Sequence, residues 1–234
     1  MRGKKLKIII YLHIYLLINH LSLLLKMLKL LVFGSSLARD LASFDKKRVH
    51  KVYGKQVKFI YKYFPGKSFE HFLDKKNRWK INVVLKCKPD FICVIFGGNS
   101  IKMGINWNDV LVSCRNFYQL LYDRFMSFNP RGKIIASQVI LRFNRNPNNR
   151  FRCPDPDTFR SFRNLVNRKL NKLRSRHHML IVAGRNNLDD ESLFLDGTHL
   201  NVHGQEIQFH ILVRTLAHVI SLQNPPSFEA RGQD

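Results

Sequence analysis

Short apolar runs alternate along this chain with longer segments of helical periodicity. Five mostly apolar runs are typical of buried strands, and they span residues 28–33, 57–63, 91–96, 133–140 and 179–183. The third run is apolar at every position, as expected of a parallel strand that is covered on both faces of its sheet.

Between these runs, apolar residues recur every three or four positions, which predicts helices. A basic loop is expected at 46–51, and helices are expected over 36–44, within 69–85, over 108–125, after the polar loop 142–157 and over 204–222. Strands that alternate with helices predict an α/β fold. We therefore expect a three-layer αβα sandwich with a five-stranded, parallel, doubly wound sheet of the flavodoxin-like order 2-1-3-4-5.

The first 26 residues form a separate segment, in which four basic residues precede the apolar stretch 8–25. This stretch fits a secretory signal, a membrane anchor or an extra helix on the domain. Membrane contact by 8–25 is not favoured, because the first strand follows too closely for a compact domain to dock against a bilayer. We divide the chain into an extension (1–26), one domain (27–223) and a polar tail (224–234).

Net charge is the most unusual property of the composition. The 234 residues suffice for one α/β domain, and 45% hydrophobic residues are ordinary for a globular protein. Forty Lys and Arg against sixteen Asp and Glu leave a net charge of +24. This excess favours an anionic partner such as nucleic acid, an acidic membrane surface or a polyanionic substrate.

The four cysteines are Cys87, Cys93, Cys114 and Cys153. They have neither the ligand spacing of a zinc site nor the density of a disulfide framework. We therefore predict no metal site and interpret the thiols as reduced. Reduced thiols favour an intracellular protein, with a membrane-anchored or secreted protein as the alternatives.

Three predicted strands end in turns whose residues suit catalysis. Ser36 follows the first strand, Gly66 the second and Asn99 the third. The carboxyl ends of parallel strands meet at one rim of a doubly wound sheet, so these residues are expected to lie close together. A carboxylate and an imidazole, Asp196 and His199, stand in a turn before the last helix.

Together these residues supply the parts of an acyl-transfer site. Ser36 would be the nucleophile and His199 its general base, with Asp196 setting the tautomer of the ring and stabilising the imidazolium. The backbone N–H groups of Ser36 and Gly66 and the side-chain amide of Asn99 would stabilise an oxyanion. Each residue alone also fits a purely structural role, for example Ser36 as a helix cap.

In order and separation, these motifs resemble four sequence blocks of the SGNH hydrolases, also called GDSL-like esterases. The usual Gly-Asp-Ser block corresponds to 34–36, the second-block glycine to Gly66, the Gly-x-Asn block to 97–99 and the Asp-x-x-His block to 196–199. The resemblance covers about residues 26–222. It implies a three-layer αβα fold and a serine hydrolase that cleaves a carboxylic ester through an acyl-serine intermediate, without metal or organic cofactor.

The sequence departs from the family pattern at two positions. Ser35 and Ser100 stand where the family usually has aspartates. Neither change removes a catalytic group, but both leave room for a domain that keeps the fold and has lost much of its rate.

A nucleic-acid-binding module is the alternative function. Between residues 130 and 180, thirteen Lys and Arg stand against two Asp. Cations of the predicted basic helix could contact phosphates, namely Arg160, Arg163, Arg168, Lys169 and Lys172. SGNH-like domains also occur in first-frame proteins of some retrotransposons. The resemblance therefore also allows a low-activity or inactive module of a retroelement-type protein that binds nucleic acid through its basic surface.

Overall fold

The computed structural model describes residues 27–102, 104–143, 155–176, 180–183 and 188–223. Several of the sequence predictions concern residues outside these ranges: the extension 1–26, the tail 224–234, Cys153, Met179 and most of the loop 142–157. They stay predictions.

Six strands form one sheet in the order β2-β3-β1-β4-β5-β6. Their bounds are β1 (Leu28–Gly34), β2 (Val49–Val52), β3 (Lys55–Tyr63), β4 (Phe91–Ile95), β5 (Lys133–Ser137) and β6 (Leu180–Ala183). All neighbours pair in parallel except β2, which is antiparallel to β3. The predicted order 2-1-3-4-5 is confirmed for β3, β1, β4, β5 and β6, and the sheet has one strand more than predicted.

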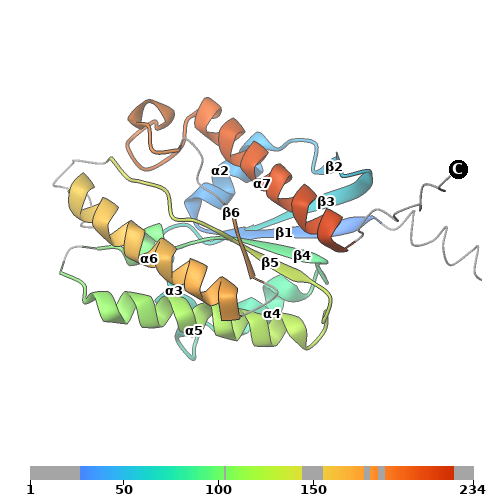
Figure 1. Cartoon of the computed structure of the whole chain (residues 1–234), viewed down its shortest axis with the longest axis horizontal. Helices are drawn as coiled ribbons and strands as arrows, with labels where there is room; N and C mark the ends of the chain where they lie inside the picture. The colour runs from blue at the N-terminus through green and yellow to red at the C-terminus, as the bar shows by residue number, and fades with distance from the viewer. Residues whose placement is uncertain (1–26, 103, 144–154, 177–179, 184–187, 224–234) are drawn as a thin grey trace, which may run out of the picture.

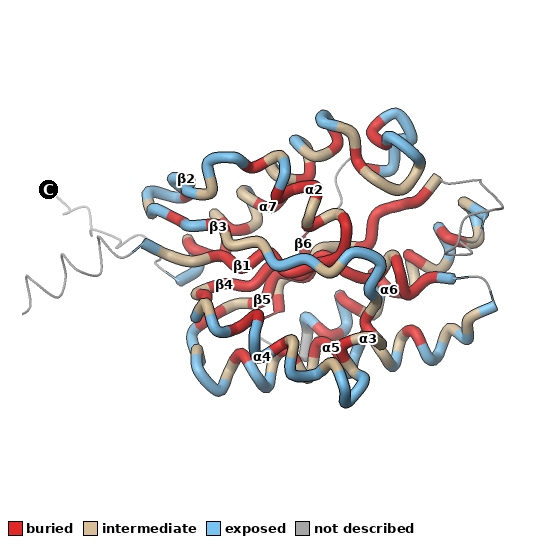
Figure 2. The backbone as a smooth tube through the Cα atoms, turned by 180° about the vertical axis from the view of Figure 1, so that it is seen from behind, coloured by how far each residue is buried: buried red, intermediate tan, exposed pale blue. Residues whose placement is uncertain are grey.

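Helices cover both faces of this sheet and complete the three predicted layers (Figure 1). Two helices lie on one face, α2 (Ser36–Phe44) and α7 (Val202–Gln223). On the other face lie α3 (Phe69–Leu73), α4 (Trp79–Leu85), α5 (Trp107–Met126) and α6 (Pro156–Arg176). Buried backbone is concentrated in the central strands, whereas the outer sides of the helices are exposed (Figure 2).

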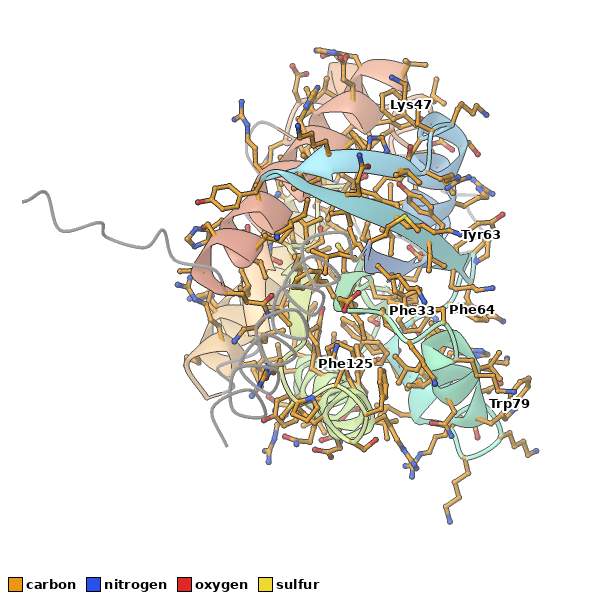
Figure 3. All side chains as sticks on the ribbon, turned by 90° about the vertical axis from the view of Figure 1, so that its right-hand side faces the viewer. Phe33, Lys47, Tyr63, Phe64, Trp79 and Phe125 are labelled. Carbon is orange, nitrogen blue, oxygen red and sulfur yellow. The ribbon has the colours of Figure 1, made fainter. Side chains whose placement is uncertain are left out.

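The first strand contributes to both hydrophobic cores, because successive side chains of a strand point to opposite faces. Leu30 and Val32 face α2 and α7, while Leu31 and Phe33 face the opposite layer. The ring of Phe33 is fully buried, and its centroid lies 5.9 Å from that of Phe64 in an edge-to-face contact (Figure 3). This packing holds the end of β1, and the turn that follows it, in place.

The predicted basic loop after α2 proved wrong in part, because it contains the short edge strand β2. Val49–Val52 turns back along β3 through Tyr53 and Gly54, which both have positive φ, as a two-residue hairpin turn requires. Lys51 lies within this strand and weakens the apolar pattern by which a strand is recognised in the sequence. Lysine is nevertheless a common residue on edge strands.

The predicted strand 133–140 also ends earlier than expected, at Ser137. Beyond it, Val139 bonds to a side chain instead of a neighbouring strand. Its N–H donates to Asn167 Oδ1 at 2.8 Å, and its carbonyl accepts from Asn167 Nδ2 at 3.2 Å. An amide on α6 therefore fixes the chain where it leaves the sheet.

A buried carboxylate, Asp45, ties the β2–β3 hairpin to the end of α2. Its oxygens accept hydrogen bonds from Tyr61 Oη at 2.7 Å and from the backbone N–H of Arg48 at 3.1 Å, and its Oδ1 lies 2.8 Å from His50 Nε2. Burial raises the pKa of Asp45, but these hydrogen bonds outweigh burial, so the pKa lies below the ordinary 3.8. The anion is the form that the fold prefers.

We therefore predict that Asp45→Asn lowers the free energy of unfolding at pH 7 by about 1.5–3 kcal/mol, the usual range for hydrogen bonds to a charged group. Because the pKa of this carboxyl is lowered on folding, its contribution is present above the unfolded pKa and is lost as the pH falls through the folded value. The difference between wild type and Asp45→Asn in urea denaturation should therefore shrink below about pH 4. A difference that stays constant down to pH 2 would contradict this role.

Candidate active site

Ser36 is the first residue of α2 and follows directly on the end of β1. It is 8% exposed, and its Oγ has no hydrogen-bond partner among the described residues. The first N–H groups of a helix also lack intrahelical acceptors, and the helix dipole is positive there. The hydroxyl thus lies where a developing negative charge would be stabilised.

A close contact between β1 and β4 positions this turn. The N–H of Ser35 donates to the carbonyl of Ile95 at 3.1 Å. A Cβ on Gly34 would come within 2.7 Å of both the Ile95 carbonyl oxygen and Ala38 Cβ, distances that packed atoms do not reach. Only glycine therefore allows the two strand ends to approach so closely.

Asp196 and His199 form the pair that their spacing predicts. His199 Nδ1 lies 2.7 Å from Asp196 Oδ2, while the backbone N–H groups of Thr198 and His199 donate to Asp196 Oδ1 at 2.9 and 2.7 Å. Burial raises the pKa of Asp196, but the hydrogen bonds from His199 and the backbone outweigh it, and the pKa lies below 3.8. A carboxylate held as an anion keeps the proton on Nδ1 and leaves Nε2 as the basic nitrogen.

The His199 turn lies beside the Ser36 turn. Thr198, which precedes His199, lines the same small cavity as Ser35 and Leu37, the two chain neighbours of Ser36. Gly98, the neighbour of Asn99, lines this cavity too. Chain neighbours of Ser36, Asn99 and His199 thus line one small cavity. In the described part of the chain, however, His199 Nε2 has no hydrogen-bond partner, so the bond to Ser36 is not formed. Such bonds are often long before substrate binds.

Asn99 lies in the 3-10 turn Gly98–Ser100 that follows β4, and it is 7% exposed. Its Nδ2 donates to the carbonyl of Lys67 at 3.0 Å. Since an amide nitrogen carries two hydrogens, one donor of Asn99 remains for a ligand. This bond also joins Asn99 to the turn that contains Gly66.

Gly66 is the third residue of a four-residue turn, in which Lys67 N–H donates to the Phe64 carbonyl at 3.2 Å. Its φ of 71° and the preceding Pro65 are typical of a type II turn. Gly66 is exposed, and among the described residues its N–H has no acceptor. The turn is linked to the site through Lys67 and through Phe64 N–H, which donates to the Gly34 carbonyl at 2.8 Å.

Arg142 is a site residue that the sequence reasoning missed. Only 9% exposed, it donates from Nη2 to Asn99 Oδ1 at 2.6 Å and lines the cavity beside Ser35. A guanidinium can only donate, so the amide oxygen must face Arg142 and the nitrogen must face the Gly66 turn. Arg142 therefore orients the amide of Asn99. Its position two residues after the predicted strand 133–140 is the only signal in the sequence.

The two serines at the expected aspartate positions are both buried. Ser100 Oγ accepts from the N–H of Phe69 and donates to Glu70 Oε2, each at 3.2 Å. It thus fixes the Asn99 turn to the first turn of α3. Ser35 is 6% exposed, and its side chain makes no capping bond to α2.

The cations of the predicted nucleic-acid surface do not share one environment. Arg163 is 2% exposed and ion-paired with Asp189, so it faces the interior. Arg160, Arg168 and Lys172 are exposed on α6, and Lys169 is half-buried.

Across the described ranges, no three His, Cys, Asp or Glu side chains are grouped so as to hold a metal ion. No helix within those ranges has the length and hydropathy needed to cross a bilayer, and residues 8–25 lie outside them. Cys87, Cys93 and Cys114, the cysteines within the described ranges, are free thiols.

Comparisons with known proteins identify the fold. No model of a protein family matches the sequence, and no curated protein matches it either. Solved structures do match. A carbohydrate esterase family 3 protein from Talaromyces cellulolyticus superposes with a TM-score of 0.60 at 16% identity, covering 83% of this chain and 99% of its own.

Two more structures agree with this result. A GDSL-like lipase from Bacteroides thetaiotaomicron has a TM-score of 0.55 at 13% identity, covering 83% of this chain and 88% of its own. An acetyl xylan esterase also has a TM-score of 0.55, at 14% identity, covering 81% and 100%. The chain therefore has the fold of the SGNH hydrolases, as its motifs predict.

We predict that Arg142→Leu lowers the free energy of unfolding by about 1–3 kcal/mol, because it leaves the buried oxygen of Asn99 without its donor. Arg142→Lys should recover part of this loss. Arg160→Leu is the matched control, since this exposed arginine should contribute within about 0.5 kcal/mol. Urea denaturation of the three variants measures the differences. Equal losses of unfolding free energy for Arg142→Leu and Arg160→Leu would contradict a role for Arg142 in holding the Asn99 amide.

Proposed function

We propose that the protein is a serine esterase of SGNH type that cleaves a carboxylic ester through an acyl-Ser36 intermediate. The observation that supports this proposal most strongly is one small cavity lined by Ser35, Gly98 and Thr198, the chain neighbours of Ser36, Asn99 and His199, next to the hydrogen-bonded Asp196–His199 pair. The solved structures of the same fold include named esterases, which supports the same reaction class.

In the first half of the reaction, Ser36 Oγ attacks the ester carbonyl while His199 Nε2 accepts its proton. The Asp196 carboxylate stabilises the imidazolium that forms, through the 2.7 Å contact with Nδ1. The carbonyl oxygen becomes an oxyanion that accepts hydrogen bonds from the Ser36 and Gly66 N–H groups and from Asn99 Nδ2. Collapse of this tetrahedral intermediate then expels the alcohol, which takes the proton from His199.

Water completes the second half. His199 Nε2 accepts a proton from a water molecule, whose oxygen attacks the acyl-serine carbonyl. The same donors stabilise the second oxyanion, and its collapse releases the carboxylic acid and returns the proton to Ser36 Oγ. No step calls for a metal ion or an organic cofactor.

We predict that Ser36→Ala lowers kcat for 4-nitrophenyl acetate by about four to six orders of magnitude, because the nucleophile is lost. Asn99→Ala should cost about two to three orders, the usual effect of removing one oxyanion donor. Ser43→Ala, an exposed serine on the same helix, is the matched control.

A fluorophosphonate probe gives an independent readout of the nucleophile. Ser36 should be labelled in the wild type and in the exposed-histidine control His203→Ala, and labelling should be lost in His199→Ala. Equal hydrolysis by wild type and Ser36→Ala would refute the esterase proposal.

A second candidate function is nucleic-acid binding by the outer face of α6. The exposed side chains of Arg160, Arg168 and Lys172 favour it, since they follow one another at intervals of eight and four residues along the helix. Such a row of cations could contact successive phosphates.

For this function we predict that the logarithm of the association constant for single-stranded RNA falls linearly with the logarithm of the salt concentration. The double variant Arg168→Glu, Lys172→Glu should reduce the slope by about one to two. Lys46→Glu, Lys47→Glu carries the same charge change on a different exposed surface and should not. A slope that is flat, or that responds equally to both double variants, would exclude a site on α6.

A further inference from the structure

Gln208 is a buried polar residue on α7 whose hydrogen-bonding capacity is unused. Its side chain is enclosed, since the residue is only 4% exposed. Within the part of the chain that the structure describes, neither Nε2 nor Oε1 has a hydrogen-bond partner. Buried amides are nearly always paired, because an unpaired one forfeits its bonds to water. An amide left unpaired on both atoms therefore indicates a ligand group.

The Gln208 amide borders two adjoining cavities, and the outer one belongs to the candidate active site. We call this one the outer cavity; it measures about 20 Å³ and is lined by Ser35, Leu37 and Thr198, the chain neighbours of Ser36 and His199. The inner one measures about 10 Å³ and reaches toward the sheet beside Cys93. Both cavities share Ile95, Gln138, Ile140 and Gln208 in their walls. Gln208 thus lines both the cavity beside the Ser36 turn and the cavity beside Cys93.

The size of these cavities limits what can enter. A cavity needs about 10–15 Å³ to hold one water-sized group, so the outer and inner spaces together accommodate one or two non-hydrogen atoms. The wall is also held in place, because Asn167 bonds to both backbone groups of Val139, which lines the outer cavity. A long acyl chain does not fit without displacing this wall.

We propose that this space is an acyl subsite for short 2-hydroxyacyl groups, such as glycolyl, and that Gln208 is its specificity-determining residue. The inference rests on the proposed esterase function. A hydroxyl both donates and accepts, so it matches the carbonyl oxygen and the amide nitrogen of Gln208 together. An acetyl group has only a methyl to place in this space, which leaves both atoms of the Gln208 amide unpaired, and sites built to bond a hydroxyl discriminate against substrates that lack it.

The test compares methyl acetate with methyl glycolate, which differ by one hydroxyl. Each kcat/KM is divided by the rate constant for hydroxide-catalysed hydrolysis of the same ester. We expect the wild type to prefer glycolate by at least about tenfold, the effect of one or two neutral hydrogen bonds. Gln208→Leu and Gln208→Met should abolish the preference. Gln56→Leu, which changes an exposed amide on β3, should retain it.

Binding to a variant that cannot react separates this inference from the esterase function. In Ser36→Ala, glycolate should bind more tightly than acetate by NMR titration, and adding Gln208→Leu should remove the difference. A binding preference without ester hydrolysis would refute the esterase and retain the subsite. Equal turnover of both esters with equal binding of both anions would overturn the subsite, with Gln208 then bonding only water. Neither hydrolysis nor a binding preference would overturn both proposals.

Discussion

The close approach of the ends of β1 and β4 is the contact on which the candidate site depends. Gly34 has no side chain to separate the strands, and the Ser35 N–H reaches the carbonyl of Ile95. This contact joins the turn that carries Ser36 to the end of β4, which leads into the turn that carries Asn99. The buried ring of Phe33 packs edge-to-face against Phe64 and so holds the same strand end in place. The strand ends therefore determine where the candidate site residues lie.

The sheet order and the rim could be predicted because both follow from local patterns. Apolar runs such as 91–96 identify buried parallel strands, and in such a sheet their carboxyl ends meet. The early end of β5 and the edge strand β2 could not be predicted. Val139 leaves the sheet because a side chain distant in sequence, Asn167, bonds to its backbone. Periodicity carries no information about such a partner.

The candidate site likewise contains contacts that could be predicted from the sequence and contacts that could not. The Asp196–His199 pair is local, so its spacing in the sequence is enough to predict the contact. The bond from Arg142 to Asn99 joins residues 43 positions apart, and no motif marks the arginine. Gln208 did leave a signal, because it stands on the buried stripe of α7 four residues before Leu212. A polar residue at such a position calls for a partner, but the sequence does not say where the partner lies.

The short strand β2 has a consequence for the protein at high concentration. A sheet with a bare outermost strand can recruit a strand from another molecule, and this is one route to fibrillar aggregates. Here the outermost strand has only four residues, and Lys51 is exposed on it. Two molecules approaching along this side would bring like charges together. The cationic character of this edge would thus keep copies of the chain from joining their sheets through β2.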